Sequence, residues 1–197
     1  MSPRTKKQFE EIREERKQQI MHAALILFAN KGFDATSISM IAKEAGISKG
    51  LMYNYFESKE KLIVEIMDGM IEEMLSMFDP NHDGVLEAHE MKNFIHIMLH
   101  HVKENQQLYK LYFHVIMQPK VFALIEGKLE EIIATISLMV EKYFENMAFE
   151  NPKIEALLFT TMLDGLFFDY VLKPELFPLD EIETQLIKQY CTKKSKS

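Results

Sequence analysis

Residues 37–59 read SISMIAKEAGISKGLMYNYFESK and describe two short helices joined by a tight turn. Apolar residues at helical spacing mark one buried face of the first helix: Ile38, Ile41, Ala42 and Ala45. Gly46 then breaks this pattern and can adopt the left-handed backbone conformation that a sharp turn requires. Ser48 is a good N-cap for the second helix. The stretch therefore predicts a helix-turn-helix, and the alternative is a small helical hairpin with a polar surface.

The second short helix carries two chemically different faces. Met52 and Phe56 share the face that would be buried. The opposite face holds a cation, a residue without a side chain, a phenol and an amide: Lys49, Gly50, Tyr53 and Asn54. Such an exposed face suits the floor of a DNA groove, where base edges offer hydrogen-bond donors and acceptors.

Around this stretch, residues 13–62 resemble the N-terminal domain of the tetracycline-repressor (TetR) family of bacterial regulators. The matching elements, in order, are Ala23-Ala24, Leu27-Phe28, Gly32-Phe33, Thr36-Ser37, Ile41-Ala42, Ala45-Gly46-Ile47-Ser48, Lys49-Gly50, Tyr53, Tyr55-Phe56 and Lys59-Glu60-Lys61-Leu62. The rest of the chain matches the family in length and helicity. The resemblance implies a homodimeric, ligand-released repressor that binds double-stranded DNA at a pseudo-palindromic operator.

DNA contacts are then expected to divide by chemistry. Lys49 would donate to guanine acceptors, and Gly50 would permit close approach to base edges. The phosphate-binding set would be Ser37, Ser39, Ser48, Tyr53, Asn54, Tyr55 and Lys59. The start of the first helix at Ser37 would add its dipole.

Composition favours an all-α chain: an N-terminal three-helix head followed by a helical ligand-binding and dimerisation body. Seven glycines and six prolines leave long helical stretches, and no run alternates in the way of a strand. We expect a flexible basic N-terminus over 1–8, the DNA-binding domain over 9–62, the body over 63–192 and a disordered tail over 193–197. A single cysteine, no signal peptide and no long apolar run predict a cytoplasmic protein without a membrane partner. No catalytic constellation is present, so an enzyme is not expected and no cofactor is required.

The formal charge of −7 is unevenly distributed. Residues 1–62 hold 11 Lys or Arg against 8 Asp or Glu, whereas the remainder holds 12 against 22. A polyanion would attract the first part and repel the second, which favours an oriented approach to DNA.

Beyond residue 58 the chain reads as successive helices: a fourth from near Ser58, then 88–104, 105–117, 120–147, 153–172 and 179–191. The resemblance implies a pocket for an unknown small-molecule effector, for which we predict Tyr112, Phe113, Met117, Phe144, Phe159, Met162 and Phe167. The last two helices resemble the family's dimer-forming pair, with Leu157, Leu158, Thr161, Leu166 and Tyr170 as candidates for a four-helix seam.

The break before the fifth helix holds an unexpected motif. Residues 79–90 read DPNHDGVLEAHE and fit the calcium-loop pattern D-x-[DN]-x-[DN]-G-x5-E. The predicted Ca²⁺ ligands are Asp79, Asn81, Asp83, the Val85 carbonyl, Glu87 and Glu90. Leu86 occupies the apolar position where such loops normally pair with a partner, and the flanks resemble an EF-hand. The alternative is a helix joint without metal. A calcium sensor or buffer is therefore the second functional hypothesis.

Histidines give a weaker metal signal. His96 and His100 have the i, i+4 spacing that can share a transition metal, and His89 lies on the same stripe. The sequence specifies no third ligand from another helix, so ordinary surface histidines are the simpler interpretation.

Overall fold

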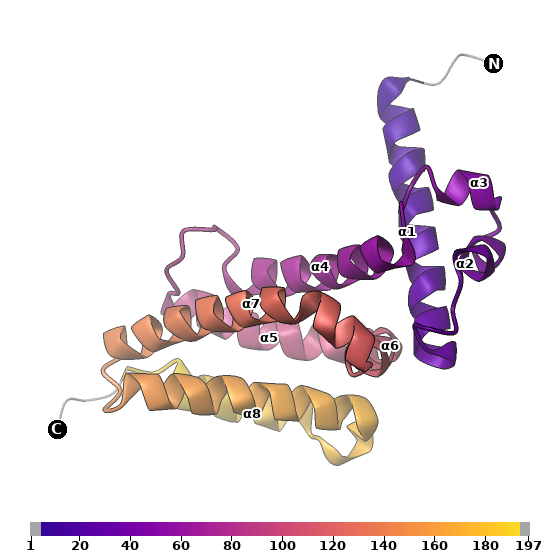
Figure 1. Cartoon of the computed structure of the whole chain (residues 1–197). Helices are drawn as coiled ribbons and strands as arrows, with labels where there is room; N and C mark the ends of the chain where they lie inside the picture. Colours follow the sequence, from indigo (N-terminus) through magenta and orange to yellow (C-terminus); the bar gives the residue numbers. More distant parts are fainter. Residues whose placement is uncertain (1–4, 194–197) are drawn as a thin grey trace. The chain divides into compact units, whose positions relative to one another are not determined.

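The computed structural model describes residues 5–193, and every regular element within them is helical (Figure 1). The elements are α1 (Lys6–Lys31), α2 (Ile38–Glu44), α3 (Lys49–Met52), α4 (Lys59–Phe78), α5 (Ala88–Glu104), α6 (Gln106–Ile116), α7 (Pro119–Asn146), α8 (Pro152–Leu172), the short 3-10 helix η1 (Pro174–Leu176) and α9 (Leu179–Tyr190). The all-α prediction is confirmed, and the expected helices after residue 58 agree with the observed ones to within about one residue at each end.

The first helix begins earlier than expected. Thr5 and Gln8 form a capping box, in which the Thr5 hydroxyl accepts from the Gln8 N–H and the Gln8 amide accepts from the Thr5 N–H. Residues 6–8, which fall within the expected flexible N-terminus, are therefore the first turn of α1. Residues 194–197 of the predicted tail and residues 1–4 of the predicted flexible N-terminus lie outside the described residues.

The chain divides into two compact units. The head comprises the described residues up to Gly69 together with Leu111–Ile125, and the body comprises Met70–Lys110 and the described residues from Glu126 onward. The domain boundary expected near residue 62 did not include a second segment of the head, which consists of the end of α6 and the start of α7.

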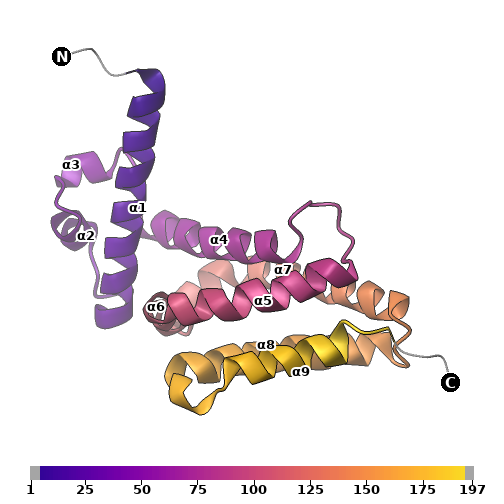
Figure 2. The same ribbon diagram turned by 180° about the vertical axis from the view of Figure 1, so that it is seen from behind.

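The head is built around the C-terminal half of α1 (Figure 2). Apolar residues of α1 lie fully buried with those of the following helices: Ile20, Ala24, Phe28, Phe33, Ile41, Met52, Phe56, Leu62 and Ile63. Phe28 and Phe33 stack obliquely, with ring centroids 5.1 Å apart. Burial of this face fixes α2 and the short α3, because neither helix is long enough to be stable alone.

The body has an aromatic core at the ends of α7, α8 and α9. The rings of Phe144, Phe159 and Tyr190 lie 4.8 to 5.7 Å apart. The buried Tyr143 hydroxyl donates to the Tyr190 carbonyl at 2.9 Å, which fixes the end of α9 to α7. Burial raises the pKa of Tyr143, so this hydroxyl keeps its proton and its role as donor. Among residues 5–193, no helix combines the length and apolarity needed to cross a membrane.

Candidate nucleic-acid interface

The turn between α2 and α3 is closed by backbone hydrogen bonds alone. Gly46 has φ +65°. Its N–H donates to the Lys43 carbonyl at 3.2 Å, and the Ile47 N–H donates to the Ala42 carbonyl at 2.9 Å. These two bonds form a Schellman motif, which ends α2 and reverses the chain. The predicted role of Gly46 is confirmed, because a side chain at this position would strain the backbone.

Serine hydroxyls begin both helices. The Ser37 hydroxyl accepts from the Met40 N–H at 3.3 Å, and the Ser48 hydroxyl accepts from the Leu51 N–H at 3.1 Å. Each cap satisfies a backbone donor that the first turn of a helix leaves unpaired. Each hydroxyl still holds its own hydrogen, which can be donated outward.

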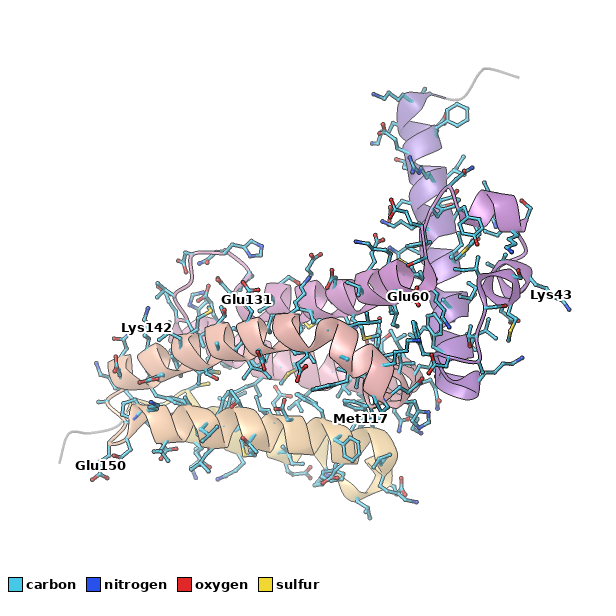
Figure 3. All side chains as sticks on the ribbon, viewed as in Figure 1. Lys43, Glu60, Met117, Glu131, Lys142 and Glu150 are labelled. Carbon is cyan, nitrogen blue, oxygen red and sulfur yellow. The ribbon has the colours of Figure 1, made fainter. Side chains whose placement is uncertain are left out.

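One face of α3 and its exit is open to solvent. Lys49, Gly50, Tyr53 and Asn54 are exposed, whereas Met52 and Phe56 on the opposite side are buried. Within residues 5–193, the side chains of Lys49, Tyr53 and Asn54 have no hydrogen bond or ion pair. Ser39 is exposed and Tyr55 is half-buried, with the Arg13 guanidinium 6.0 Å from the Tyr55 ring centroid. On α2, Lys43 points away from the head (Figure 3).

Gly50 has no structural reason to be glycine within the described chain. Its backbone φ is not positive, and a Cβ added there would meet no atom within 4 Å. Alanine is also the better helix former by about 1 kcal/mol. A requirement for glycine at this position can therefore come only from something that approaches α3 from outside.

Lys59, which is predicted to contact a DNA phosphate, hydrogen-bonds to backbone carbonyls of the head. Its ammonium group donates to the carbonyls of Phe33, Thr36 and Asp34, at 2.8, 3.0 and 3.3 Å. It also lies 4.5 Å from the Phe33 ring centroid. All three N–H donors are thus used inside the head, where they hold the loop after α1 against the start of α4. Lys59 is a structural brace, and its donors are not free for phosphate.

A second brace on the same loop has no local signal in the sequence. Gln118 accepts from the Phe33 N–H at 2.6 Å and donates to the Phe28 carbonyl at 2.9 Å. Lys120 pairs with Asp34 at 2.8 Å. The hydrogen bond from Lys120 lowers the pKa of Asp34, and the same bond raises the pKa of Lys120. The α6–α7 corner therefore contacts the loop that leads into α2.

The predicted effector pocket is only partly compatible with the structure. Phe144 and Phe159 are 0% and 1% exposed and pack edge to face, so they are core residues of the body. Met162 is 37% exposed, and Met117 is 69% exposed (Figure 3). Tyr112 and Phe113 on α6 and Phe167 on α8 are half-buried. These seven residues include both core and surface positions.

Several polar side chains of the loop at residues 79–90 form hydrogen bonds within the loop. Asp79 accepts from the Gly84 N–H at 3.0 Å, and Glu90 accepts from the Glu87 N–H at 2.9 Å. The Asn81 amide donates to both Asp83, at 3.2 Å, and Glu90, at 3.1 Å. Glu90 is 4% exposed, and the Asp79 Oδ1 atom is buried without a hydrogen-bond partner among the described residues.

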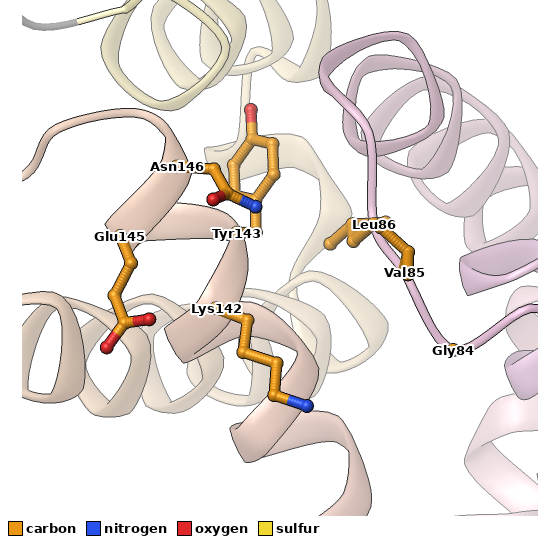
Figure 4. Close-up of a pocket in the computed structure, with 7 residues that line it drawn as sticks. All are labelled: Gly84, Val85, Leu86, Lys142, Tyr143, Glu145 and Asn146. Carbon is orange, nitrogen blue, oxygen red and sulfur yellow. The ribbon is translucent and has the colours of Figure 1, made fainter.

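Leu86 anchors this loop to the end of α7. It is buried and points toward Tyr143, beside a shallow pocket of about 340 Å³ that is also lined by Lys142 and Asn146 (Figure 4). In calcium loops that work in pairs this apolar residue faces the second loop, whereas here Leu86 packs on α7. The Val85 side chain is exposed and apolar, so Val85 could offer a cation only its backbone carbonyl.

Comparisons with known proteins agree with this geometry. Residues 20–66 match the family described as bacterial regulatory proteins, tetR family. The chain is 26% identical over 188 residues to the HTH-type transcriptional regulator YhgD of Bacillus subtilis, covering 91% of this chain and 96% of that protein. It is 25% identical over 130 residues to IcaR of Staphylococcus epidermidis, a negative regulator of the biofilm operon icaADBC, covering 66% and 69%.

A similar fold occurs in NalD of Pseudomonas aeruginosa, the secondary repressor of the MexAB-OprM multidrug efflux pump. That structure aligns with a TM-score of 0.66 and 19% identity, covering 90% of this chain and 95% of NalD. The family match spans the helix-turn-helix, and the structural likeness extends over the helical remainder. Residues 20–66 therefore match a tetR-family DNA-binding domain, and over most of its length the chain is similar to helix-turn-helix transcriptional regulators.

Proposed function

We propose that this regulator is a repressor that binds a pseudo-palindromic DNA operator as a homodimer and leaves it when a small molecule binds the body. The observation that carries the DNA contact is the open face of α3. It combines an unpaired ammonium, a phenol and an amide around Gly50, whose missing side chain the protein's own packing does not require. Repression is favoured by the names of IcaR and NalD, both negative regulators.

The contacts divide by the groups that each residue leaves free. Lys49 donates to guanine N7 and O6, while Gly50 lets the backbone approach the base edges. The remaining phosphate-binding set donates from hydroxyls and an amide: Ser37, Ser39, Ser48, Tyr53, Asn54 and Tyr55. Because Ser37 and Ser48 use only their lone pairs as caps, their hydroxyl hydrogens can serve DNA at the same time.

Dimerisation is supported by the outer face of α8. Leu157, Leu158 and Leu172 are 60%, 56% and 49% exposed, while Phe159 and Leu163 on the inner face are buried. A helix that is apolar on both faces is typical of a position between two layers, and only one layer is present in the single chain. Tyr170, 7% exposed, belongs to the inner layer and not to the seam. A second copy would supply the missing layer as a four-helix seam.

The route for ligand release passes through the α6–α7 corner. Gln118 holds the Phe33 N–H and the Phe28 carbonyl, and Lys120 holds Asp34. A ligand that displaces α6 or α7 would therefore pull on the loop that begins α2. Coupling of about 1 to 3 kcal/mol would lower operator affinity by roughly 5- to 150-fold.

Selection from a random duplex pool tests this function and does not require the operator sequence. We expect the chain to enrich a two-fold symmetric sequence, with half-sites about one helical turn apart or a multiple of it. Sedimentation of the same sample should give a dimer at micromolar concentration. Leu157→Glu should give a monomer of intact helicity, because this side chain is not part of the core. Failure to enrich any sequence, or a monomeric wild type, would contradict the proposal.

For the loop at residues 79–90 we propose calcium binding as a property of the body, beside DNA binding. The support is the buried, unpartnered Asp79 Oδ1 at the first ligand position. In addition, the Asn81 N–H group lies between the Asp83 and Glu90 carboxylates. An amide in that place supplies the partial positive charge that a cation would supply more strongly. Rotating the amide would present its oxygen to Ca²⁺, which prefers six to eight oxygen ligands.

A further inference from the structure

Two helices of the body bring a second group of metal-ligating side chains together. The helices α5 and α9 pack against each other and run antiparallel (Figure 2). Residues Ala88 and Lys92 near the start of α5 face Lys188 and Cys191 near the end of α9. One turn and two turns further along α5, His96 and His100 consequently reach Glu183 on α9.

The three side chains already lie at distances that a metal ion could close. His96 Nδ1 is 2.8 Å from Glu183 Oε1, and His100 Nε2 is 3.6 Å from Glu183 Oε2. The two imidazole rings are 4.4 Å apart between centroids, and one ligand atom from each residue lies within 4.8 Å of the others. The Glu183 side chain is 19% exposed, whereas those of His96 and His100 are 56% and 44% exposed. The carboxylate is therefore held in place, and solvent has access to the imidazoles.

We propose that His96, His100 and Glu183 bind a divalent transition-metal ion of the zinc type. Zn²⁺ holds imidazole nitrogen and carboxylate oxygen at about 2.0 to 2.2 Å, so tetrahedral ligand atoms lie roughly 3.4 Å apart. The two observed distances between imidazole nitrogen and carboxylate oxygen, 2.8 and 3.6 Å, lie on either side of this spacing of roughly 3.4 Å. Small side-chain rotations would bring the most distant ligand atoms, now within 4.8 Å of one another, to the same spacing. Two imidazoles and one carboxylate leave the fourth position to water, and nitrogen ligands favour zinc, nickel or copper over calcium.

Metal binding at this site replaces a hydrogen bond with coordination. In the metal-free protein, a proton on His96 Nδ1 is shared with Glu183. The metal takes the Nδ1 lone pair, and the proton displaced from Nδ1 moves to solvent or to Nε2 of the same ring. Because the ligands come from two helices, the ion would clamp α5 to α9. The site would thus stabilise the body independently of whether the chain binds DNA.

This zinc site differs in chemistry from the loop at residues 79–90. The loop offers only oxygen atoms and suits a hard cation, whereas the α5–α9 site offers two nitrogens. Millimolar calcium can therefore occupy the loop during a zinc titration without competing for the histidines. The two sites can be tested in one protein.

Zinc titration of the full, untagged chain in millimolar calcium tests the proposal. We expect one zinc ion per chain by equilibrium dialysis. At zinc a hundred times its Kd, Tm should rise by roughly 5 to 10 °C. His96→Gln, His100→Gln and Glu183→Gln should each weaken zinc binding at least about 10-fold.

His89→Gln is the matched control. His89 lies on the same helix and also pairs with a glutamate, Glu87 at 3.0 Å, yet it has no second imidazole beside it. Its removal should leave zinc binding unchanged. Zinc binding that survives Glu183→Gln at full strength would overturn the proposal, because the ion would then not join α5 to α9. Equal loss in His89→Gln, or no zinc bound by the wild type, would overturn it as well.

Discussion

The α2–α3 turn and the α4–α5 loop are both helix joints with a left-handed glycine, Gly46 and Gly84, but they use polar side chains in opposite ways. In the α2–α3 turn the backbone closes on itself, and serine caps are the only side chains needed. In the α4–α5 loop side chains close the turn, with Asp79 and Asp83 accepting from the N–H groups of Gly84 and Val85.

This difference decides what each joint can bind. A turn closed by its backbone leaves Lys49, Tyr53 and Asn54 free to reach an extended partner. In the loop at residues 79–90, by contrast, the carboxylates of Asp79, Asp83 and Glu90 accept hydrogen bonds from N–H groups of the same loop. The first joint is therefore the candidate surface for a macromolecule, and the second is a candidate cation site. Four substitutions can break or sharpen this contrast.

The largest effect is expected from Gly50→Ala. Operator affinity should fall about 10- to 100-fold, the size of losing a good base contact, because a methyl group would separate α3 from the base edges. Stability should be unchanged or rise slightly, since the added Cβ meets nothing in the protein and alanine favours the helix. Fluorescence anisotropy with operator DNA and thermal unfolding measure the two quantities.

Gly127→Ala is the matched control for this substitution. Gly127 is also helical, and an added Cβ there also meets no atom within 4 Å, but it lies in α7. It should show the same stability change and normal operator binding. If Gly50→Ala binds the operator normally, α3 does not approach the base edges as proposed.

Lys59→Ala should mainly lower the stability of the head. Removing the ammonium leaves the carbonyls of Phe33, Thr36 and Asp34 without their shared donor. We expect a loss of about 1 to 3 kcal/mol in the free energy of unfolding, measured by urea denaturation. Lys61→Ala, an exposed lysine on the same turn of α4, should cost much less. If both variants were equally stable and only Lys59→Ala lost DNA binding, the result would favour a phosphate contact by Lys59.

Calcium tests the second joint. Millimolar calcium should raise the Tm of the wild type by a few degrees, because the ion binds the folded loop and not the unfolded chain. Glu90→Gln should abolish this rise, since the amide removes the carboxylate that would bind with two oxygens. Glu72→Gln, an exposed change on α4, should keep it. An unchanged Tm in the wild type would leave the loop as a helix joint.

The smallest effect is expected from Asp34→Asn. Lys120 lowers the pKa of Asp34 in the folded state, so this carboxylate stabilises the head fully at pH values above its ordinary unfolded pKa. That contribution is lost as the pH falls through the lowered folded pKa. The variant should therefore melt slightly below the wild type at pH 7, and the difference should disappear in strong acid. The effect is small because both groups are solvent-exposed. If the difference in Tm between wild type and Asp34→Asn persisted at low pH, its cause would be packing and not the charge of Asp34.

Much of the fold could be predicted because its signals are local. The Gly46 turn, the serine caps and the apolar spacing of α2 and α3 depend on residues within five positions of one another. Exposure of Lys49, Gly50, Tyr53 and Asn54 followed from the same spacing. The role of Lys59 could not be predicted in this way, because its three carbonyl partners lie 23 to 26 residues away.

The sequence by itself determined an all-helical chain with a helix-turn-helix, since helix period, caps and turn glycines act between near neighbours. Tertiary structure alone decided which polar groups are used. It placed Gln118 on Phe33, 85 residues away, and Glu183 on His96, 87 residues away. It also made Phe144 and Phe159 core residues. The physical reason is that a hydrogen bond or a ring contact requires atoms within a few ångströms, and only the packing of helices brings residues so distant in sequence that close.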